Sequence, residues 1–150
     1  MTSIVQNSVS SYASLKQQVR ETLLLGRRRI EQEKLKTYWQ TGRLIEEHIL
    51  QHKDRAGYGE EVIERLSKDL GVSKSSFYET LRFARTFPIF HARGKLTWAH
   101  YRKLATVANS KERQKLLTQA QKSEWTSREL EIRVSQVNAL ESDPTAKPAL

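Results

Sequence analysis

The segment from Val62 to Arg85 constrains the fold more than any other part of this chain, because its pattern is typical of two helices joined by a tight turn. Gly71 divides the segment, and glycine enters the left-handed backbone region without the steric cost that a side chain imposes. Ser73 follows the turn and can cap the second helix by accepting hydrogen bonds from its free N–H groups. Apolar residues recur at helical spacing on both sides, and we expect them to face a shared core: Leu66, Leu70, Val72, Phe77 and Leu81. The sequence therefore predicts a helix-turn-helix at about residues 60–86.

The remaining residues at the start of the second helix are polar and are expected to face outward. They are Ser73, Lys74, Ser75, Ser76, Tyr78, Glu79 and Arg82. None is a large aliphatic residue, and most can hydrogen-bond bases or contact phosphates. A helix presented on such an edge fits the DNA major groove, which is about 12 Å wide. An ordinary helical hairpin with a solvated polar face would show the same pattern.

The formal net charge of +9 is unevenly distributed along the chain. Residues 72–103 carry a net charge of +6, whereas residues 54–71, which contain the first helix, carry −2. This asymmetry favours a surface that binds a polyanion. We expect six cations to contact phosphates, namely Arg82, Arg85, Arg93, Lys95, Arg102 and Lys103. We expect the residues nearest the bases to be Ser73, Lys74, Ser75, Ser76 and Tyr78.

The composition excludes several classes of protein. The chain has no cysteine, so disulfides and thiolate metal sites are ruled out, and this fits a reducing cytoplasm. It contains no apolar run long enough to cross a membrane and no signal-peptide pattern. We therefore expect a cytoplasmic protein without a membrane partner. Its organisation is predicted as one helical domain at residues 12–140, between disordered segments at residues 1–11 and 141–150.

A long helical pattern begins near Tyr12 and continues to about Gln51. An unbroken helix of this length would be about 60 Å long, which exceeds the size of a small domain. Gly26 is therefore where we expect a break or a kink. A helix that extends beyond its own domain favours a homodimer, and the alternative is a helix that only wraps its own core. The arginines at residues 27–29 spread around the helix, so we expect them to be solvated.

The rest of the chain also predicts helices. Pro88 disfavours helix at the residue before it, so the second helix of the helix-turn-helix should end near Thr86. Three further helices are expected to open at Thr97, Ser110 and Thr126. No segment alternates strongly enough to be a strand. The predicted fold class is all-α.

Aromatic residues follow Thr97 at helical spacing. Trp98 and Tyr101 are three residues apart and favour core packing over base stacking. His100 lies between them, and it could support the turn through a hydrogen bond or reach a phosphate. Tyr38 and Trp39 on the long helix are also expected in the core.

Residues for catalysis or metal binding do not cluster in the sequence. His48 and His52 lie four residues apart, as metal ligands on a helix can, but the glutamate of the metalloprotease arrangement and a third ligand are missing. The histidines and carboxylates form no catalytic grouping. We therefore expect a protein that is not an enzyme and that needs neither a cofactor nor a metal.

Several short motifs occur in an order and spacing that resemble a known family. They are YWQTGRLIE at residues 38–46, LSKDL at 66–70, LTWAHY at 96–101, and Trp125 followed by REL at 128–130. Together they resemble the N-terminal domain of the YhcG-type proteins, which are bacterial proteins with a PD-(D/E)xK nuclease. The resemblance covers about residues 15–137.

This resemblance implies a helical winged-helix or helix-turn-helix DNA-binding module, with the nuclease in a separate C-terminal domain. A PD-(D/E)xK site needs acidic residues and a lysine on adjoining strands. The sequence shows neither, so we do not expect nuclease activity here. A looser similarity relates residues 66–130 to the DNA-binding domain of ParB partition proteins, in which a helix-turn-helix is followed by small buttressing helices.

The sequence thus predicts a sequence-specific or structure-specific DNA-binding protein, a regulator or DNA-targeting module whose ligand is double-stranded DNA. The main alternative is a protein-interaction module that docks onto a separately encoded nuclease or modification enzyme. A regulator from a toxin–antitoxin system or a phage would resemble the first prediction physically. The alternatives differ in their response to salt, because only DNA binding depends steeply on it.

Overall fold

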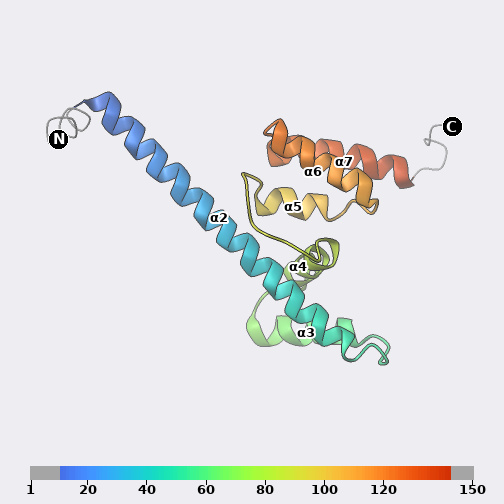
Figure 1. Cartoon of the computed structure of the whole chain (residues 1–150). Coiled ribbons are helices and arrows are strands. Elements are labelled where there is room, and N and C mark those ends of the chain that lie inside the picture. Colours follow the sequence, from blue (N-terminus) through green and yellow to red (C-terminus); the bar gives the residue numbers. More distant parts are fainter. Residues whose placement is uncertain (1–10, 143–150) are drawn as a thin grey trace.

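A computed structural model describes residues 11–142, which form six helices (Figure 1). The helices are α2 (Tyr12–Leu50), α3 (Tyr58–Leu70), α4 (Lys74–Thr86), α5 (Trp98–Leu104), α6 (Ser110–Lys122) and α7 (Ser127–Ser142). No strand occurs in this part of the chain, so the predicted all-α class is confirmed. Among the same residues, no helix combines the length and the apolarity that crossing a membrane requires.

The predicted disordered segments fall mainly at residues 1–10 and 143–150, which lie outside the described residues. Three of their inner residues, Ser11, Glu141 and Ser142, lie within the described part of the chain. Ser11 is the N-cap of α2, and its hydroxyl accepts a hydrogen bond from the Ser14 N–H. At the other end, α7 continues through Glu141 to Ser142.

Helix α2 runs unbroken through Gly26, so the predicted break is wrong. A glycine inside a helix costs only about 1 kcal/mol relative to alanine, and the leucines and arginines beside Gly26 are good helix formers. The C-terminal half of α2 packs against the other helices, whereas its N-terminal half projects beyond them (Figure 1). The helix is therefore the axis on which the rest of the chain is assembled.

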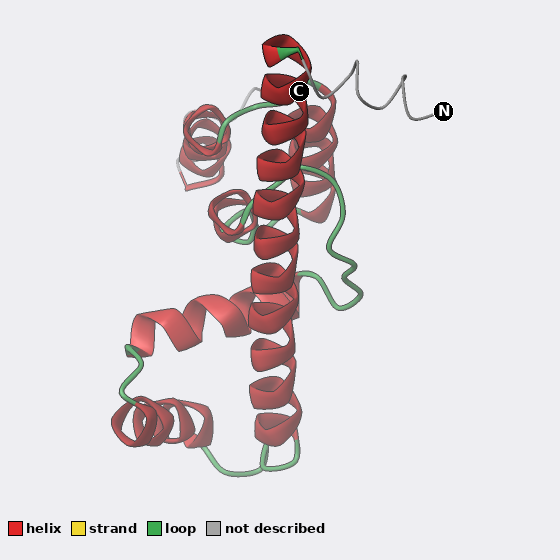
Figure 2. Ribbon diagram, turned by 90° about the vertical axis from the view of Figure 1, so that its left-hand side faces the viewer, coloured by secondary structure: helices red, strands yellow, loops and turns green. Residues whose placement is uncertain are grey.

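Helix α4 crosses α2 at close range, and Gly42 makes this crossing possible. Gly42 is buried, and a Cβ atom added there would lie 2.0 Å from the Thr80 carbonyl oxygen and 2.8 Å from the Ala84 Cβ. Figure 2 shows α4 running from this crossing away from α2, towards its connection with α3. Gly42 thus sets the distance between the long helix and α4.

Two apolar clusters fill the interior. The smaller one joins α2, α3 and α4 and consists of Ile45, Ile63, Phe77 and Leu81, with Ile49 and Leu66 against it. The larger one joins α2 and α4 to α5, α6 and α7 and includes Leu35, Phe83, Tyr101, Leu104 and Leu130. Tyr38, Trp39 and Trp98 pack against the larger cluster, which confirms their predicted core roles.

His100 is buried, and both nitrogens of its ring have internal partners. The Thr97 N–H donates to His100 Nδ1 at 3.0 Å, so Nε2 carries the proton and donates to the Trp125 carbonyl oxygen at 2.8 Å. The bonds tie the start of α5 to the segment before α7. Of the two predicted roles, support of the turn is the one that this geometry bears out.

Helix ends mostly follow the local signals. Thr126 and Glu129 form the predicted capping box, in which each side chain accepts from the backbone N–H of the other. Helix α6 begins at Ser110 as expected, but its cap is Asn109, whose side chain accepts from the Glu112 N–H at 3.0 Å. Helix α4 ends at Thr86, as Pro88 predicts.

Candidate nucleic-acid interface

The turn between α3 and α4 has the predicted local geometry. Gly71 adopts φ 69°, in the left-handed region, and its N–H donates to the Ser67 carbonyl oxygen at 3.0 Å. The Ser73 hydroxyl then accepts from the Ser76 N–H at 3.1 Å and caps α4. Two helices joined by a short turn therefore lie where the sequence predicts them.

Two residues of the predicted shared core are not in it. Leu70 is 63% exposed and Val72 is 39% exposed. The connection between α3 and α4 lies on the side away from α2 (Figure 2), so residues beside Gly71 extend past the cluster that covers Ile63. Leu66, one turn earlier, is the last residue of α3 that packs against this cluster.

Helix α4 presents a polar outer strip. Its inner side is buried and consists of Phe77, Thr80, Leu81, Phe83 and Ala84. The residues at helical spacing on the opposite side are all exposed, and we call them the outer strip of α4: Lys74, Ser75, Tyr78, Arg82 and Arg85. Tyr78, Arg82 and Arg85 border an open hollow of about 230 Å³. The structure thus brings together most of the residues that the sequence assigned to the second helix.

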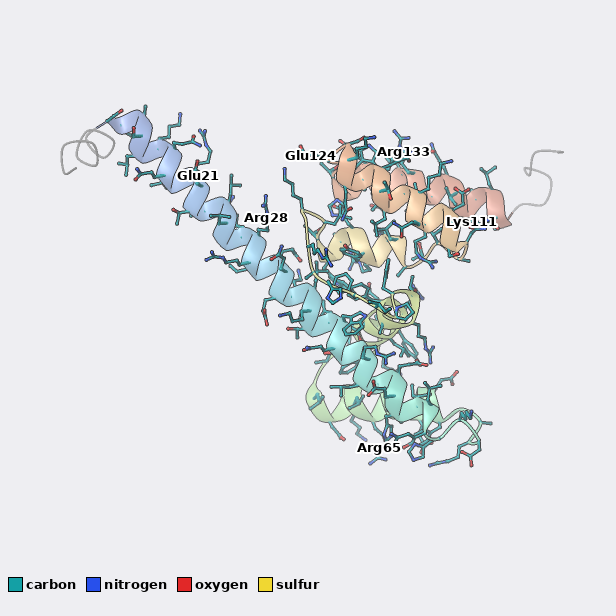
Figure 3. All side chains as sticks on the ribbon, in the orientation of Figure 1. Glu21, Arg28, Arg65, Lys111, Glu124 and Arg133 are labelled. Carbon is teal, nitrogen blue, oxygen red and sulfur yellow. The ribbon has the colours of Figure 1, made fainter. Side chains whose placement is uncertain are left out.

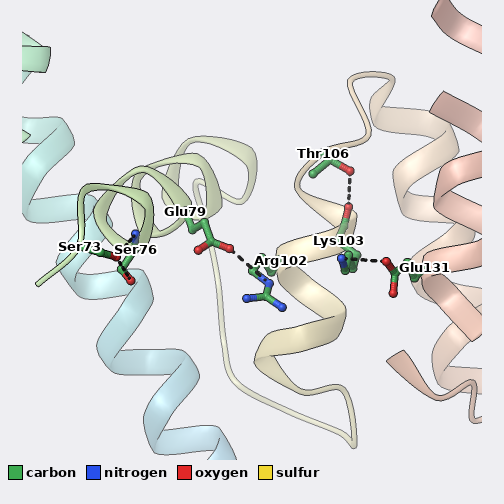
Figure 4. Close-up of polar contacts among 7 residues, drawn as sticks. All are labelled: Ser73, Ser76, Glu79, Arg102, Lys103, Thr106 and Glu131. Atoms are coloured by element: carbon green, nitrogen blue, oxygen red, sulfur yellow. Dashed lines mark hydrogen bonds and ion pairs between the residues drawn. The ribbon is translucent and has the colours of Figure 1, made fainter. Parts of the chain in front are cut away.

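Ser73 and Ser76 lie beside the outer strip and bond to each other. Their hydroxyl oxygens are 2.8 Å apart, in addition to the capping bond from the Ser76 N–H (Figure 4). Both side chains remain exposed, so they can still offer a second hydrogen bond to a ligand.

Four of the predicted phosphate-binding cations form ion pairs with carboxylates. The pairs are Arg85 with Glu46, Lys95 with Glu124, Arg102 with Glu79 and Lys103 with Glu131. The Arg102–Glu79 pair, with nitrogen and oxygen 3.3 Å apart, links α5 to α4 and places Arg102 on the same side of the molecule as Ser76 (Figure 4). Lys74, Arg82 and Arg93 take part in no ion pair among the described residues. A cation that already has a carboxylate partner must exchange it for a phosphate.

Arg93 and Lys95 lie apart from the outer strip. The segment just before Arg93, residues 90–92, borders a hollow of about 690 Å³ on one side of α2. Ser76 and Trp98 border a different hollow, of about 370 Å³, with other residues of α2. Figure 2 shows that the connection between α4 and α5 and the N-terminal end of α4 lie on opposite sides of α2. The structure therefore does not gather all the predicted cations on one surface.

The model of one protein family matches most of the chain. It is described as the DUF1016 N-terminal domain, and it matches residues 14–138. The chain belongs to this family. The match confirms the resemblance to the N-terminal domain of the YhcG-type proteins, and the domain is associated with a nuclease family. No curated protein matches the chain, and no solved structure does.

The sequence reasoning missed a row of lysines on α6 of this DUF1016 N-terminal domain. Lys111, Lys115 and Lys122 are exposed at spacings of four and seven residues, which puts them on one side of the helix. None of them joins an ion pair among the described residues, and Figure 3 shows Lys111 projecting from α6. The spacing of these lysines could have revealed the row from the sequence, because the helix that carries them was already predicted. A solvated charged face would give the same spacing.

The two histidines at the end of α2 bond within the domain. His48 Nε2 lies 2.9 Å from the Tyr58 hydroxyl, and His52 Nδ1 lies 3.0 Å from the His48 carbonyl oxygen. Among the described residues, no group of three or more histidine and carboxylate side chains is placed to hold a metal ion. The rings serve here to join the end of α2 to the start of α3.

Among residues 11–142, the fold shifts the pKa values of Tyr101 and Glu124. Burial raises the pKa of the Tyr101 phenol above its usual value. The hydrogen bond from Lys95 lowers the pKa of the Glu124 carboxyl, and the charge of Lys95 acts in the same direction. Neither group belongs to the outer strip of α4, so neither shift bears on recognition by that surface.

Proposed function

We propose that this domain is a DNA-binding module without catalysis of its own, and that the outer strip of α4 enters the major groove of double-stranded DNA. The observation that carries the proposal is the composition of this strip. It combines hydroxyl groups with cations and contains no large aliphatic residue, although the other side of α4 is almost wholly apolar. Hydroxyl groups can hydrogen-bond base edges, and lysine and arginine bind phosphates.

The ion pairs divide the cations into two classes. Lys74 and Arg82 have no carboxylate partner within residues 11–142, so phosphate contacts by them should add fully to affinity. Arg85 and Arg102 must first leave Glu46 and Glu79, which reduces their net contribution. We therefore expect Arg82→Ala to weaken DNA binding more than Arg102→Ala.

The test is the fluorescence anisotropy of a labelled random-sequence duplex, titrated with the protein over a series of salt concentrations. Each phosphate that the protein neutralises should contribute about 0.9 to the slope of log K against log salt. The triple variant Lys74→Ala/Arg82→Ala/Arg85→Ala should lose most of the affinity and flatten the slope by about 2 to 3.

The matched control is Lys111→Ala/Lys115→Ala/Lys122→Ala, which removes the same charge from α6. It should retain steep salt dependence and most of the affinity. If the control loses binding and the α4 variant keeps it, the interface is on α6 and the proposal is wrong. If the wild-type protein does not bind DNA at low salt, the DNA proposal fails as a whole.

The second candidate function is docking onto a separately encoded nuclease or modification enzyme. The association of this domain with a nuclease family favours it. Binding to such an enzyme would depend on apolar contacts and would change little with salt. Titrating a purified nuclease partner at two salt concentrations separates this candidate from DNA binding.

A further inference from the structure

The N-terminal half of α2 carries an apolar stripe that no other described segment covers. Large apolar residues recur there at spacings of three or four and are exposed, and we call the following set the free stripe: Tyr12, Leu15, Val19, Leu23 and Ile30. Figure 1 shows this half of α2 projecting beyond the other helices, and Figure 3 shows Glu21 and Arg28 standing clear of them. The contact that ties α2 to α5 begins only at Glu31, which accepts from the Trp98 N–H.

The free stripe does not continue the side of α2 that faces the core. The core side is marked by Leu35, Gly42 and Ile45. At about 100° per residue, the centre of the free stripe lies roughly a third of a turn away from the centre of that side. Any further helix that packed against the same side of α2 as α4 and α5 would therefore leave the free stripe uncovered. The free stripe needs a separate partner.

An uncovered stripe of this kind is physically unusual. Soluble monomers rarely expose a long contiguous apolar surface, and a helix gains most of its stability from packing its apolar side. From Tyr12 to Ile30 the free stripe is about 28 Å long at 1.5 Å per residue. That length is sufficient for helix pairing along several turns.

The spacing of the free stripe suits pairing with an identical helix. Steps of three, four and four residues lead from Tyr12 to Leu23, and steps of three and four then lead through Gly26 to Ile30. An eleven-residue repeat keeps a stripe nearly straight along a helix. Two copies can then bury the same residues against each other, as a two-fold interface requires. Outside the local backbone of α2 and the two residues next to Gly26, no described atom lies within 4 Å of where a Cβ of Gly26 would be, so a second helix can approach closely there.

The charges beside the free stripe decide the direction of pairing. One flank carries three cations, Lys16, Arg20 and Arg27, whereas the other carries Gln18, Thr22 and a single cation, Arg29. Antiparallel helices would place the basic flank against its own copy, whereas parallel helices place it against the other flank. We propose that residues 12–30 of α2 form a parallel, in-register helix pair with a second copy of this chain.

This pairing does not depend on the proposed function, because it can be measured without DNA. If both proposals hold, the dimer carries two outer strips related by a two-fold axis and suits a pair of DNA half-sites. A protein that pairs but does not bind DNA would refute only the proposed function.

The first test is sedimentation of the full chain over a range of concentrations. The variant Val19→Gln/Leu23→Gln removes apolar side chains from the free stripe and keeps good helix formers. Its control is Leu24→Gln/Leu25→Gln, because these leucines are 52% and 50% exposed, like Leu23 at 52%, but lie off the stripe. We expect the stripe variant to raise the dissociation constant of the dimer by about tenfold or more, and the control by less than about threefold.

The second test uses the absence of cysteine from the sequence. Leu15→Cys and Ile30→Cys are two single-cysteine variants at the two ends of the free stripe. In a parallel pair, each variant forms a disulfide-linked dimer by itself under mild oxidation. In an antiparallel pair, only a mixture of the two variants does so.

Three results would overturn the inference. The wild-type chain could remain monomeric at every concentration that its solubility allows, which would assign the free stripe to a different occupant. The dimer could survive the Val19/Leu23 variant and be lost in the Leu24/Leu25 control. Crosslinking could require the mixture of cysteine variants, which would show antiparallel helices.

Discussion

Replacing Gly42 with alanine tests the packing on which the position of α4 depends. The new Cβ would lie 2.0 Å from the Thr80 carbonyl oxygen, whereas carbon and oxygen atoms of neighbouring helices normally stay about 3.3 Å apart. Helix α4 would have to move by about 1.3 Å. Because the obstacle is backbone rather than a flexible side chain, the overpacking cost should be near the upper end of the usual range, about 3 kcal/mol.

Alanine also favours the helix by about 1 kcal/mol relative to glycine. The expected net loss in the free energy of unfolding is therefore about 2 kcal/mol. For a chain of this size, that corresponds to a fall in Tm of about 4–8 °C in a thermal melt followed by circular dichroism.

Gly26→Ala is the matched control, since it makes the same chemical change on the same helix. A Cβ at Gly26 meets no atom of any other segment in the described part of the chain within 4 Å, so only the gain in helix propensity remains and Tm should stay equal or rise. Both variants should be melted at a concentration where they sediment as the same species. A Gly42→Ala protein that melts at or above the wild-type temperature would show that α2 and α4 are not in close contact at Gly42.

Three further predictions concern α5 and the segment before α7. Burial raises the pKa of Tyr101, so the folded state favours the neutral phenol over the phenolate. The contribution of this group to the free energy of unfolding is therefore fully present below about pH 10 and declines above it, by up to about 1.4 kcal/mol per pH unit. Tyr101→Phe should remove this decline, and thermal melts at pH 8 and pH 11 will measure it; an equal alkaline loss in both proteins would contradict the assignment. His100→Leu leaves the Thr97 N–H and the Trp125 carbonyl unpaired and should cost about 2–4 kcal/mol in urea unfolding, and a loss well below 1 kcal/mol would show that water replaces the histidine. Glu124 has φ 52° just after α6, and glycine adopts this conformation without strain, whereas the exposed ion pair with Lys95 contributes little to stability. Glu124→Gly should therefore raise Tm in a thermal melt, and a fall in Tm would contradict this reasoning.

Local signals predicted much of the fold correctly. Gly71, Ser73 and Pro88 act on backbone atoms within a few residues of themselves, and the end of α3 and both ends of α4 follow from them. The capping box of Thr126 and Glu129 is equally local. Periodicity correctly predicted that Phe77 and Leu81 of α4 face inward, because the buried side of a helix repeats every three or four residues, but Thr80, Phe83 and Ala84 are buried as well and were not predicted.

Nonlocal packing decided the points on which the prediction was wrong. Leu70 has the right spacing for the core, but α3 extends past the cluster at that position, and only the arrangement of the three helices shows it. Gly26 and Gly42 look alike in the sequence and both belong to α2. Gly26 lies on the half of α2 that projects from the domain, whereas Gly42 lies where α2 crosses α4.

For the candidate site, the sequence by itself determined the outer strip of α4 and the family to which the chain belongs. Only the tertiary structure decided which cations are paired with Glu46, Glu79, Glu124 and Glu131, and that the segment just before Arg93 borders a different hollow from the outer strip of α4. The physical reason is the range of the interactions. Capping and periodicity act within one or two helical turns, whereas an ion pair or a helix crossing joins residues that the chain order separates by tens of positions.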